Sequence, residues 1–245
     1  MKVTALGIWG GYPKANSATS SFLVEHMGFR LLFDCGSGVL ASLQNYLSVQ
    51  ELDAVILSHY HHDHIADIGP LQYAKLIQNQ LNETDKLLPI YAHNQDKQAF
   101  DQLTFQQHTK GIALTEDEKL KIGPFTVHTL RTNHPAYCLA VRLEASGKRI
   151  VFTADSGWKN ELVSFAQDAD IFICEANLYR NLEGQISGHM SGRQAGKLAE
   201  KADVKRMILT HLPHFGNLED LLQEAKNHFG GEAELAEAGN SYEVV

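Results

Sequence analysis

The sequence has few cysteines and no long apolar run. Cys35, Cys138 and Cys174 are odd in number, widely spaced and set within or beside apolar stretches. That usage is typical of buried, reduced thiols rather than a disulfide framework, so we expect a cytoplasmic protein. No apolar stretch approaches the length of a membrane span, and the N-terminus opens on a strand-like pattern without the layout of a signal peptide. We therefore expect neither secretion nor membrane insertion.

Positive charge is also scarce. The chain has 21 Lys and Arg against 29 Asp and Glu, a formal net charge of −8. Broad binding of nucleic acid needs basic residues that neutralise phosphates, so a nucleic-acid partner is not expected. The sequence also lacks repeats, low-complexity tracts and linkers. With 245 residues, 44% of them hydrophobic, it can bury a full core as a single domain over residues 1–245.

Histidine, by contrast, is concentrated in residues 59–64, which read His-Tyr-His-His-Asp-His directly after the apolar run 55–57. Side chains alternate in an extended segment, so His59 and His61 should point the same way, while Asp63 and His64 turn toward a second position. Neutral imidazole and carboxylate are the ligands that zinc and similar divalent ions prefer. The segment therefore predicts a metal site at the end of a strand.

Three further apolar runs end in residues of the same kinds. Residues 150–154 lead to Asp155, residues 207–210 lead to His211, and the run 127–132 is soon followed by His134. Sheets of α/β proteins commonly place functional side chains at the carboxyl ends of buried strands. We therefore expect these strand ends to converge with residues 59–64 on one crevice.

The order of the expected elements favours a mixed α/β fold rather than a purely parallel, doubly wound one. Hydrophobic periodicity and turn residues predict a hairpin over 23–34, helices over 36–46, 65–81, 95–105, 158–167, 191–201 and 217–228, and strands over 90–92, 125–132, 137–144, 149–154, 232–236 and 242–244. Pro70 fits the first turn of its helix.

These residues resemble the metallo-β-lactamase superfamily, and they look most like its tRNase Z and phosphodiesterase branch. The segment 58–64 is similar to the family's HxHxDH signature, and the other matching positions occur in family order over nearly the whole chain: residues 32–36, His134, Asp155, Ser156, Glu175, Ala176, His189 and His211. The resemblance implies an αββα sandwich, in which two mixed β-sheets are flanked by helices, with a dinuclear metal site at one edge of the sheets.

The resemblance also implies the arrangement of the ligands. It assigns His59, His61 and His134 to one metal, Asp63, His64 and His211 to the other, and Asp155 to a bridging position. A hydroxide shared by two such ions is nucleophilic at neutral pH and suits hydrolysis of a phosphodiester. Asp63 can also orient that hydroxide or accept its proton. Zinc is the expected metal, although manganese or iron would also suit the ligands.

His189 is expected to act on the substrate. It stands two residues before Ser191, which forms an S-x-x-Q capping box with Gln194 at the start of a helix. By resemblance, His189 contacts the substrate phosphate and protonates the leaving oxygen; the alternative is a histidine that only packs beside the helix. Glu175 is either the group that orients a histidine or an ordinary carboxylate at a strand end.

Three other polar residues stay open. His214, three residues after His211, either reaches substrate or lies in a solvated loop. Asp34 and Asp67 either support the ligands or serve turns and the surface.

The chain departs from the family pattern in one place that bears on substrate. Members that mature tRNA carry a long arm between the strands bearing the third histidine and the bridging aspartate, whereas here His134 and Asp155 are only 21 residues apart. The resemblance therefore favours a small anionic substrate, most of all a small or cyclic phosphodiester, and it implies a homodimer. The alternatives are a hydrolase of a thioester, lactone or aryl sulfate, an RNA-processing nuclease of the tRNase Z type, and a metal-containing RNA-binding or scaffold protein without catalysis.

Overall fold

The computed structural model describes residues 1–244 and divides the chain into two compact units. The first unit comprises residues 1–115 and 238–243, and the second comprises residues 116–237 with Val244. Each unit is built on one seven-stranded sheet. The single domain expected from the sequence stays a prediction.

The sheet of the first unit has the strand order β14-β1-β2-β3-β4-β5-β6. Its elements are β1 (Lys2–Gly7), β2 (Ser21–His26), β3 (Phe29–Phe33), β4 (Ala54–Ile56), β5 (Leu88–His93), β6 (Thr109–Leu114), β14 (Ser241–Glu243), α1 (Val39–Leu43), α2 (His62–Ile65), α3 (Ile68–Leu81), α4 (Lys97–Asp101) and a 3₁₀ turn at Val49–Glu51. The pairs from β14 to β3 are antiparallel, and those from β3 to β6 are parallel.

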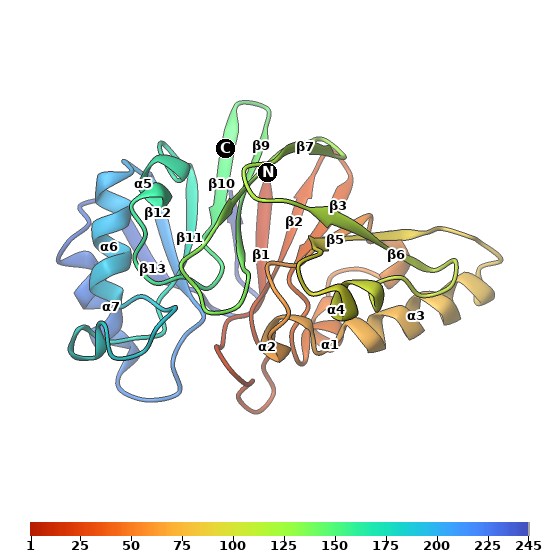
Figure 1. Ribbon diagram of the computed structural model, residues 1–245, viewed down its shortest axis with the longest axis horizontal. Helices are drawn as coiled ribbons and strands as arrows, with labels where there is room; N and C mark the ends of the chain where they lie inside the picture. The colour runs from red at the N-terminus through yellow and green to blue at the C-terminus, as the bar shows by residue number, and fades with distance from the viewer. Residues whose placement is uncertain (245) are drawn as a thin grey trace. The chain divides into compact units, whose positions relative to one another are not determined.

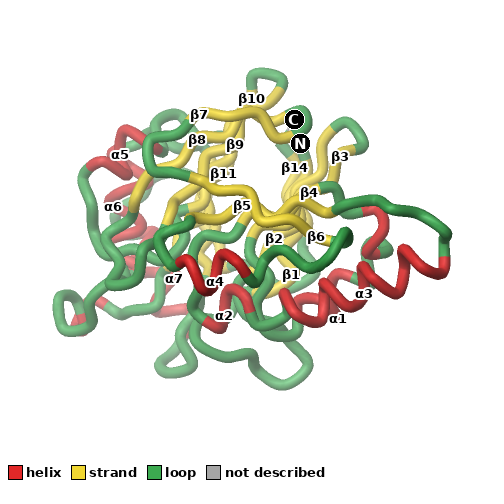
Figure 2. Tube along the Cα trace, turned by 45° about the vertical axis from the view of Figure 1, so that its right-hand side comes forward, coloured by secondary structure: helices red, strands yellow, loops and turns green. Residues whose placement is uncertain are grey.

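The core of the first unit lies between its sheet and its helices. Leu23, Leu32 and Val55 from the strands cluster with Leu43 from α1 and Leu71 from α3, and all five are buried. Burial of such apolar side chains is the main force that holds helices onto a sheet. Figures 1 and 2 show α1 and α3 lying along the strands of this unit.

The sheet of the second unit has the strand order β13-β12-β11-β10-β9-β8-β7. Its elements are β7 (Lys119–Ile122), β8 (Phe125–Arg131), β9 (Leu139–Ala145), β10 (Lys148–Phe152), β11 (Ile171–Glu175), β12 (Arg206–Thr210), β13 (Glu232–Leu235), α5 (Glu161–Phe165), α6 (Gly192–Lys201), α7 (Leu218–Lys226) and a 3₁₀ turn at Arg180–Leu182. Strands β7 to β10 pair antiparallel, and β10 to β13 pair parallel. Helices α5 and α6 lie beside this sheet in Figure 1.

The fold predicted from the sequence, two mixed sheets flanked by helices, is confirmed. Two edge strands, β6 and β7, were not predicted: β6 has weak alternation of buried and exposed side chains, and β7 alternates but is only four residues long. The helix expected over 36–46 is confined to Val39–Leu43, and the one expected over 95–105 is confined to Lys97–Asp101. Pro70 lies in the first turn of α3, as predicted.

Two expectations concern the cysteines and membrane-spanning helices of the described residues, 1–244. The three cysteines are buried and free of disulfides, as predicted. Within the same residues, the structure contains no helix with the length and apolar character needed to cross a bilayer.

Candidate metal centre

In the first unit, the predicted ligands follow β4. His59 is buried at the end of the strand, His61 is exposed at the start of α2, and Asp63 and His64 lie within that helix. The ring centroids of His59 and His61 are 4.6 Å apart, and those of His59 and His64 are 4.2 Å apart. The imidazoles of His59 and His61 thus lie together, as predicted from the alternation of side chains, and the turn into α2 brings His64 beside His59.

Asp34 orients two of these imidazoles. This fully buried carboxylate follows β3 and accepts a hydrogen bond from His64 Nδ1 at 2.8 Å. It also accepts from the backbone N–H and the hydroxyl of Ser58, whose Oγ lies 3.0 Å from His59 Nδ1. Because the Nδ1 atoms face these oxygens, Nε2 is the nitrogen of each ring that suits a metal.

Two glycines complete the surroundings of Asp63. The backbone N–H of Gly11, in the glycine-rich loop before β2, donates to Asp63 Oδ2 at 2.7 Å. A Cβ on Gly36 would lie 1.9 Å from the backbone oxygen of Asp63, so only glycine lets the loop after β3 approach α2 so closely. The backbone therefore fixes the position of the Asp63 carboxylate.

In the second unit, parallel strands bring the predicted residues to one edge of the sheet. Asp155 follows β10, Glu175 ends β11 and His211 follows β12, and these three neighbouring strands run parallel. All three residues are buried, and His211 Nε2 lies 3.4 Å from Asp155 Oδ1. The ligand atoms of Asp155, His189 and His211 lie within 4.8 Å of one another. Such donors suit a divalent ion.

His134 reaches the same edge because β8 runs parallel to β10, with the antiparallel β9 between them. The Thr132 hydroxyl donates to the backbone oxygen of Asp155 at 2.7 Å and ties the two strand ends together. His134 Nδ1 lies 3.1 Å from the carbonyl oxygen of Gly188. This hydrogen bond leaves Nε2 as the ring nitrogen suited to a metal.

His189 is held differently from the other histidines. Its Nδ1 lies 3.0 Å from Oε1 of Glu175, a carboxylate that is only 1% exposed. Glu175 also accepts hydrogen bonds from the backbone N–H groups of Ser156 and Asn177. The capping box predicted for Ser191 and Gln194 is present at the start of α6, two residues after His189. The Glu175 carboxylate therefore holds the imidazole itself, and the capping box fixes the backbone that follows it.

The donor chemistry of both units fits divalent metal ions. Four imidazole or carboxylate side chains gather in the first unit, and Asp155, His211 and His134 gather in the second. The hydrogen bonds from Nδ1 at His59, His64 and His134 place the ring proton on Nδ1, so the lone pair that a metal needs is on Nε2. These side chains are candidate metal-binding residues.

Three residues whose roles the sequence left open, Asp34, Asp67 and His214, and one that it missed, Gly188, can now be placed. Asp34, which was left open, supports His64 and Ser58, whereas Asp67 accepts from the backbone N–H of Leu40 at the start of α1. Gly188 carried no signal in the sequence. His214 is half-buried in the loop before α7.

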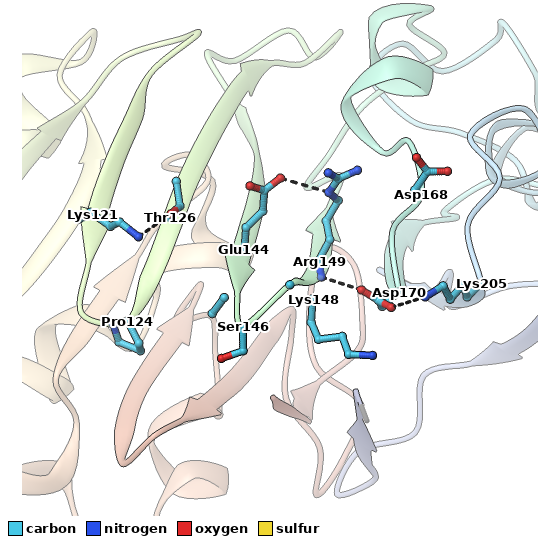
Figure 3. A pocket seen from close by; sticks show the side chains of 12 residues that line it. Lys121, Pro124, Thr126, Glu144, Ser146, Lys148, Arg149, Asp168, Asp170 and Lys205 are labelled. Atoms are coloured by element: carbon cyan, nitrogen blue, oxygen red, sulfur yellow. Dashed lines mark hydrogen bonds and ion pairs between the residues drawn. The ribbon is translucent and has the colours of Figure 1, made fainter.

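A cavity of about 550 Å³ in the second unit lies at the opposite ends of the strands from Asp155, Glu175 and His211. In Figure 3 the guanidinium of Arg149 donates to Glu144, the backbone N–H of Arg149 donates to Asp170, and the ammonium of Lys205 also donates to Asp170. Burial alone would raise the pKa of Asp170, but these hydrogen bonds and the nearby lysines hold it below its usual value. The cavity is thus lined by the ion pairs Arg149–Glu144 and Lys205–Asp170.

The comparisons with known proteins identify the family of this chain. Residues 29–212 match the family model described as a beta-lactamase superfamily domain. The chain is 47% identical over 243 residues to the probable metallo-hydrolase YhfI of Bacillus subtilis (strain 168), which covers 99% of this chain and 100% of that protein.

Solved structures give the same fold. The crystal structure of the metallo-beta-lactamase fold protein YhfI matches with a TM-score of 0.94 at 46% identity, over 98% of each chain. A diphosphatase of the PhnP family has a TM-score of 0.79 at 15% identity, over 100% of this chain and 98% of that one. The short form of human tRNase Z has a TM-score of 0.74 at 21% identity, over 100% of both chains. The predicted fold class is thereby confirmed.

Proposed function

Because this chain belongs to the β-lactamase superfamily and is a metallo-hydrolase, we propose that it is a phosphodiesterase that acts on small or cyclic phosphodiesters. Membership of the superfamily carries the hydrolase assignment. The substrate class, the number of ions and the residue roles are the content of the proposal.

We assign the ligands to two ions as the family resemblance implies. His59, His61 and His134 hold one divalent ion, Asp63, His64 and His211 hold a second, and Asp155 serves both. The ions supply Lewis acidity and a water-derived nucleophile near neutral pH when they are bound. Zinc is the expected metal, because imidazole-rich sites suit it, and manganese or iron fit the same donors.

The protein groups divide the proton transfers between them. Glu175 holds Nδ1 of His189, so Nε2 is the nitrogen that donates a proton to the leaving oxygen of the substrate. An imidazole suits this role because its ordinary pKa lies near neutrality. Asp63, fixed by the backbone N–H of Gly11, orients the attacking water and accepts its proton.

One observation carries the phosphodiesterase assignment: His189 is paired with Glu175 and lies within 4.8 Å of the ligand atoms of Asp155 and His211. A proton donor beside metal ligands suits a reaction whose leaving group is an alkoxide, because that group must be protonated. Two proteins of similar fold, a PhnP-family diphosphatase and tRNase Z, are named for reactions at phosphate.

A small substrate fits this chain better than precursor tRNA. Residues 134–155 contain only the hairpin of β9 and β10 where tRNA-processing relatives carry an arm, and the net charge is −8. Hydrolysis of a thioester, lactone or aryl sulfate by the same metal site is the second candidate. A catalytically inactive RNA-binding or scaffold protein is disfavoured by the paired His189.

The proposal is tested by steady-state turnover of metal-loaded protein on cyclic and linear nucleotides and bis(p-nitrophenyl) phosphate, beside thioester, lactone and aryl sulfate analogues. Diesters should give the highest kcat/KM. The variant His189→Ala should keep its metal by elemental analysis yet lose about 10²-fold or more in kcat, because the general acid is gone. The exposed His228 provides a matched control, and His228→Ala should turn over normally.

Strong turnover of another ester with none of a diester would replace the proposal by the second candidate. Full activity of His189→Ala would remove this histidine from the mechanism.

We also propose that the protein works in the cytoplasm as a homodimer. The three buried, unbridged cysteines support a reducing compartment. The dimer rests on the family resemblance alone.

A further inference from the structure

A second cavity in the second unit, of about 650 Å³, lies between the loops that follow β11 and β12. Tyr179, Arg180, Phe215, Asn217, Asp220 and Glu224 are among its lining residues. It is distinct from the cavity of Figure 3, which lies at the other ends of the same strands.

The cavity is closely connected to the candidate catalytic residues. Tyr179 comes four residues after Glu175, and Phe215 comes four residues after His211. The side chain of Asn177 donates to the backbone oxygen of His211 at 2.9 Å and joins the two loops. The two loops that line the cavity are therefore the ones that begin at Glu175 and His211.

Two aromatic side chains in contact with each other, Tyr179 and Phe215, line the cavity. The Tyr179 hydroxyl donates to the backbone oxygen of Phe215 at 3.1 Å, and the two ring centroids are 5.7 Å apart. A Cβ on Gly216 would lie 2.5 Å from the Tyr179 ring, so glycine lets the loop lie flat against it. Phe215 is 46% exposed, so part of its ring surface is accessible for stacking with a ligand.

Asp220, Glu224 and Arg180 add charged groups to the lining of the cavity. Both carboxylate oxygens of Glu224 accept from the backbone N–H of Arg180, at 3.0 and 3.1 Å, and Asp220 lines the same space. Burial, followed by the charges of Asp220 and Glu224, raises the pKa of Tyr179, so its phenol stays protonated. Carboxylates repel a second phosphate but accept hydrogen bonds from amino groups.

We infer that this cavity binds the nucleobase of a nucleoside phosphodiester, with Phe215 as the stacking residue and the carboxylates facing an amino-bearing base edge. The inference rests on the proposed phosphodiesterase function and names its substrate class. Every nucleobase can stack on an aromatic side chain, whatever its identity. The carboxylates of Asp220 and Glu224 favour an adenine-like base, which carries an amino group, over further phosphates. A single nucleotide fits this cavity better than an oligonucleotide, because the carboxylates repel additional phosphates.

The test uses two diesters that share one leaving group: the p-nitrophenyl ester of adenosine 5′-monophosphate and methyl p-nitrophenyl phosphate. Metal-loaded full-length protein should prefer the adenosine ester. The variant Phe215→Ala should lower kcat/KM for that ester about 10-fold, mainly through KM, and change the methyl ester less than twofold. Phe215→Tyr, which keeps the ring, should restore the preference.

Tyr73→Ala is the matched control, because Tyr73 is an exposed aromatic residue on α3 in the first unit. It should leave both esters unchanged. Calorimetric binding of adenosine to metal-free protein adds a readout without turnover, and Phe215→Ala should weaken it about 10-fold.

The outcomes separate the inference from the function. Turnover of both esters without preference, equal losses on both in Phe215→Ala, or a preference for p-nitrophenylphosphorylcholine would overturn base recognition while phosphodiesterase activity stands. Adenosine binding that depends on Phe215, without turnover of either ester, would support the cavity and overturn the proposed reaction.

Discussion

Among the non-glycine residues with left-handed backbone conformations, three lie at or beside the candidate ligands. Asp34, Ala154 and His211 have φ values of 57°, 49° and 55°, and they follow β3, β10 and β12. Such conformations cost on the order of 1 kcal/mol each and persist only where the surroundings hold them. At Asp34, hydrogen bonds from Ser58 and His64 do so. The strained residues coincide with the positions that aim candidate ligands and their support.

Gly188 provides a prediction at the same scale. A Cβ at this position would lie 2.5 Å from His134 Nδ1 and from Pro135 Cδ, so Gly188→Ala must displace the imidazole. We expect zinc affinity, measured by competition with a chelator, to fall by about 10-fold or more, as for other losses of support to a ligand histidine.

Gly184→Ala is the matched control. Gly184 has a similar left-handed φ of 77°, but a Cβ there meets nothing within 4 Å. This variant should show only the backbone cost, about 1 kcal/mol in urea unfolding, with zinc affinity unchanged. Equal zinc affinities in the two variants would refute the role of the Gly188 contact.

At the scale of elements, α3 contains an unusual buried cation. Lys75 is fully buried, and its ammonium donates to the side-chain oxygen of Gln50. Gln50 in turn donates to Asn79, which contacts His108. Burial, with a smaller contribution from the charge of Lys86, lowers the pKa of Lys75 to about 8. The polar chain holds α3 in place at the cost of desolvating a charge.

This arrangement predicts a pH dependence of stability. The pKa of Lys75 is about 8 when folded and 10.5 in its ordinary state, so the unfolded chain binds more protons between these values. The free energy of unfolding should therefore gain about 3 kcal/mol from this residue as pH rises from 8 to 10.5. Below pH 8 the penalty is present in full.

Urea unfolding of wild type and Lys75→Met across this range isolates the effect, because other titrating groups are common to both. The stability difference should shift in favour of wild type as pH rises. Lys110→Met, which changes an exposed lysine on β6, should leave the pH profile of wild type intact. Parallel profiles for wild type and Lys75→Met would contradict the assigned pKa.

At the scale of the whole molecule, the two units carry their donors in different ways. The first unit takes four candidate ligands from residues 59–64, whereas the second collects them from the ends of β8, β10 and β12. Each unit has a mixed sheet whose parallel half bears candidate residues. The proposed pair of ions needs donors from both.

Metal content tests that requirement. Wild type should bind two ions per chain by elemental analysis after exhaustive buffer exchange, and Asp155→Ala should fall well below two, because a shared carboxylate serves both ions. The exposed Asp101 on α4 is a suitable control, and Asp101→Ala should retain wild-type content. Unchanged stoichiometry in Asp155→Ala would show that this residue does not serve both ions.

The sequence by itself determined the features that arise from short-range order. The capping box at Ser191, the run of ligands at 59–64 and the strands that end near Asp155 and His211 all follow from local periodicity and residue type. The edge strands β6 and β7 did not, because β6 alternates weakly between buried and exposed side chains and the alternation of β7 extends over only four residues.

Only the tertiary structure decided which groups hold the candidate ligands. Asp34 and His64 are 30 positions apart, and His134 and Gly188 are 54 positions apart. No local pattern joins such residues, since their contact depends on strand order and on where each loop returns. Local sequence therefore selected the candidate metal-binding side chains, while long-range packing supplied the groups that fix their tautomers and orientation.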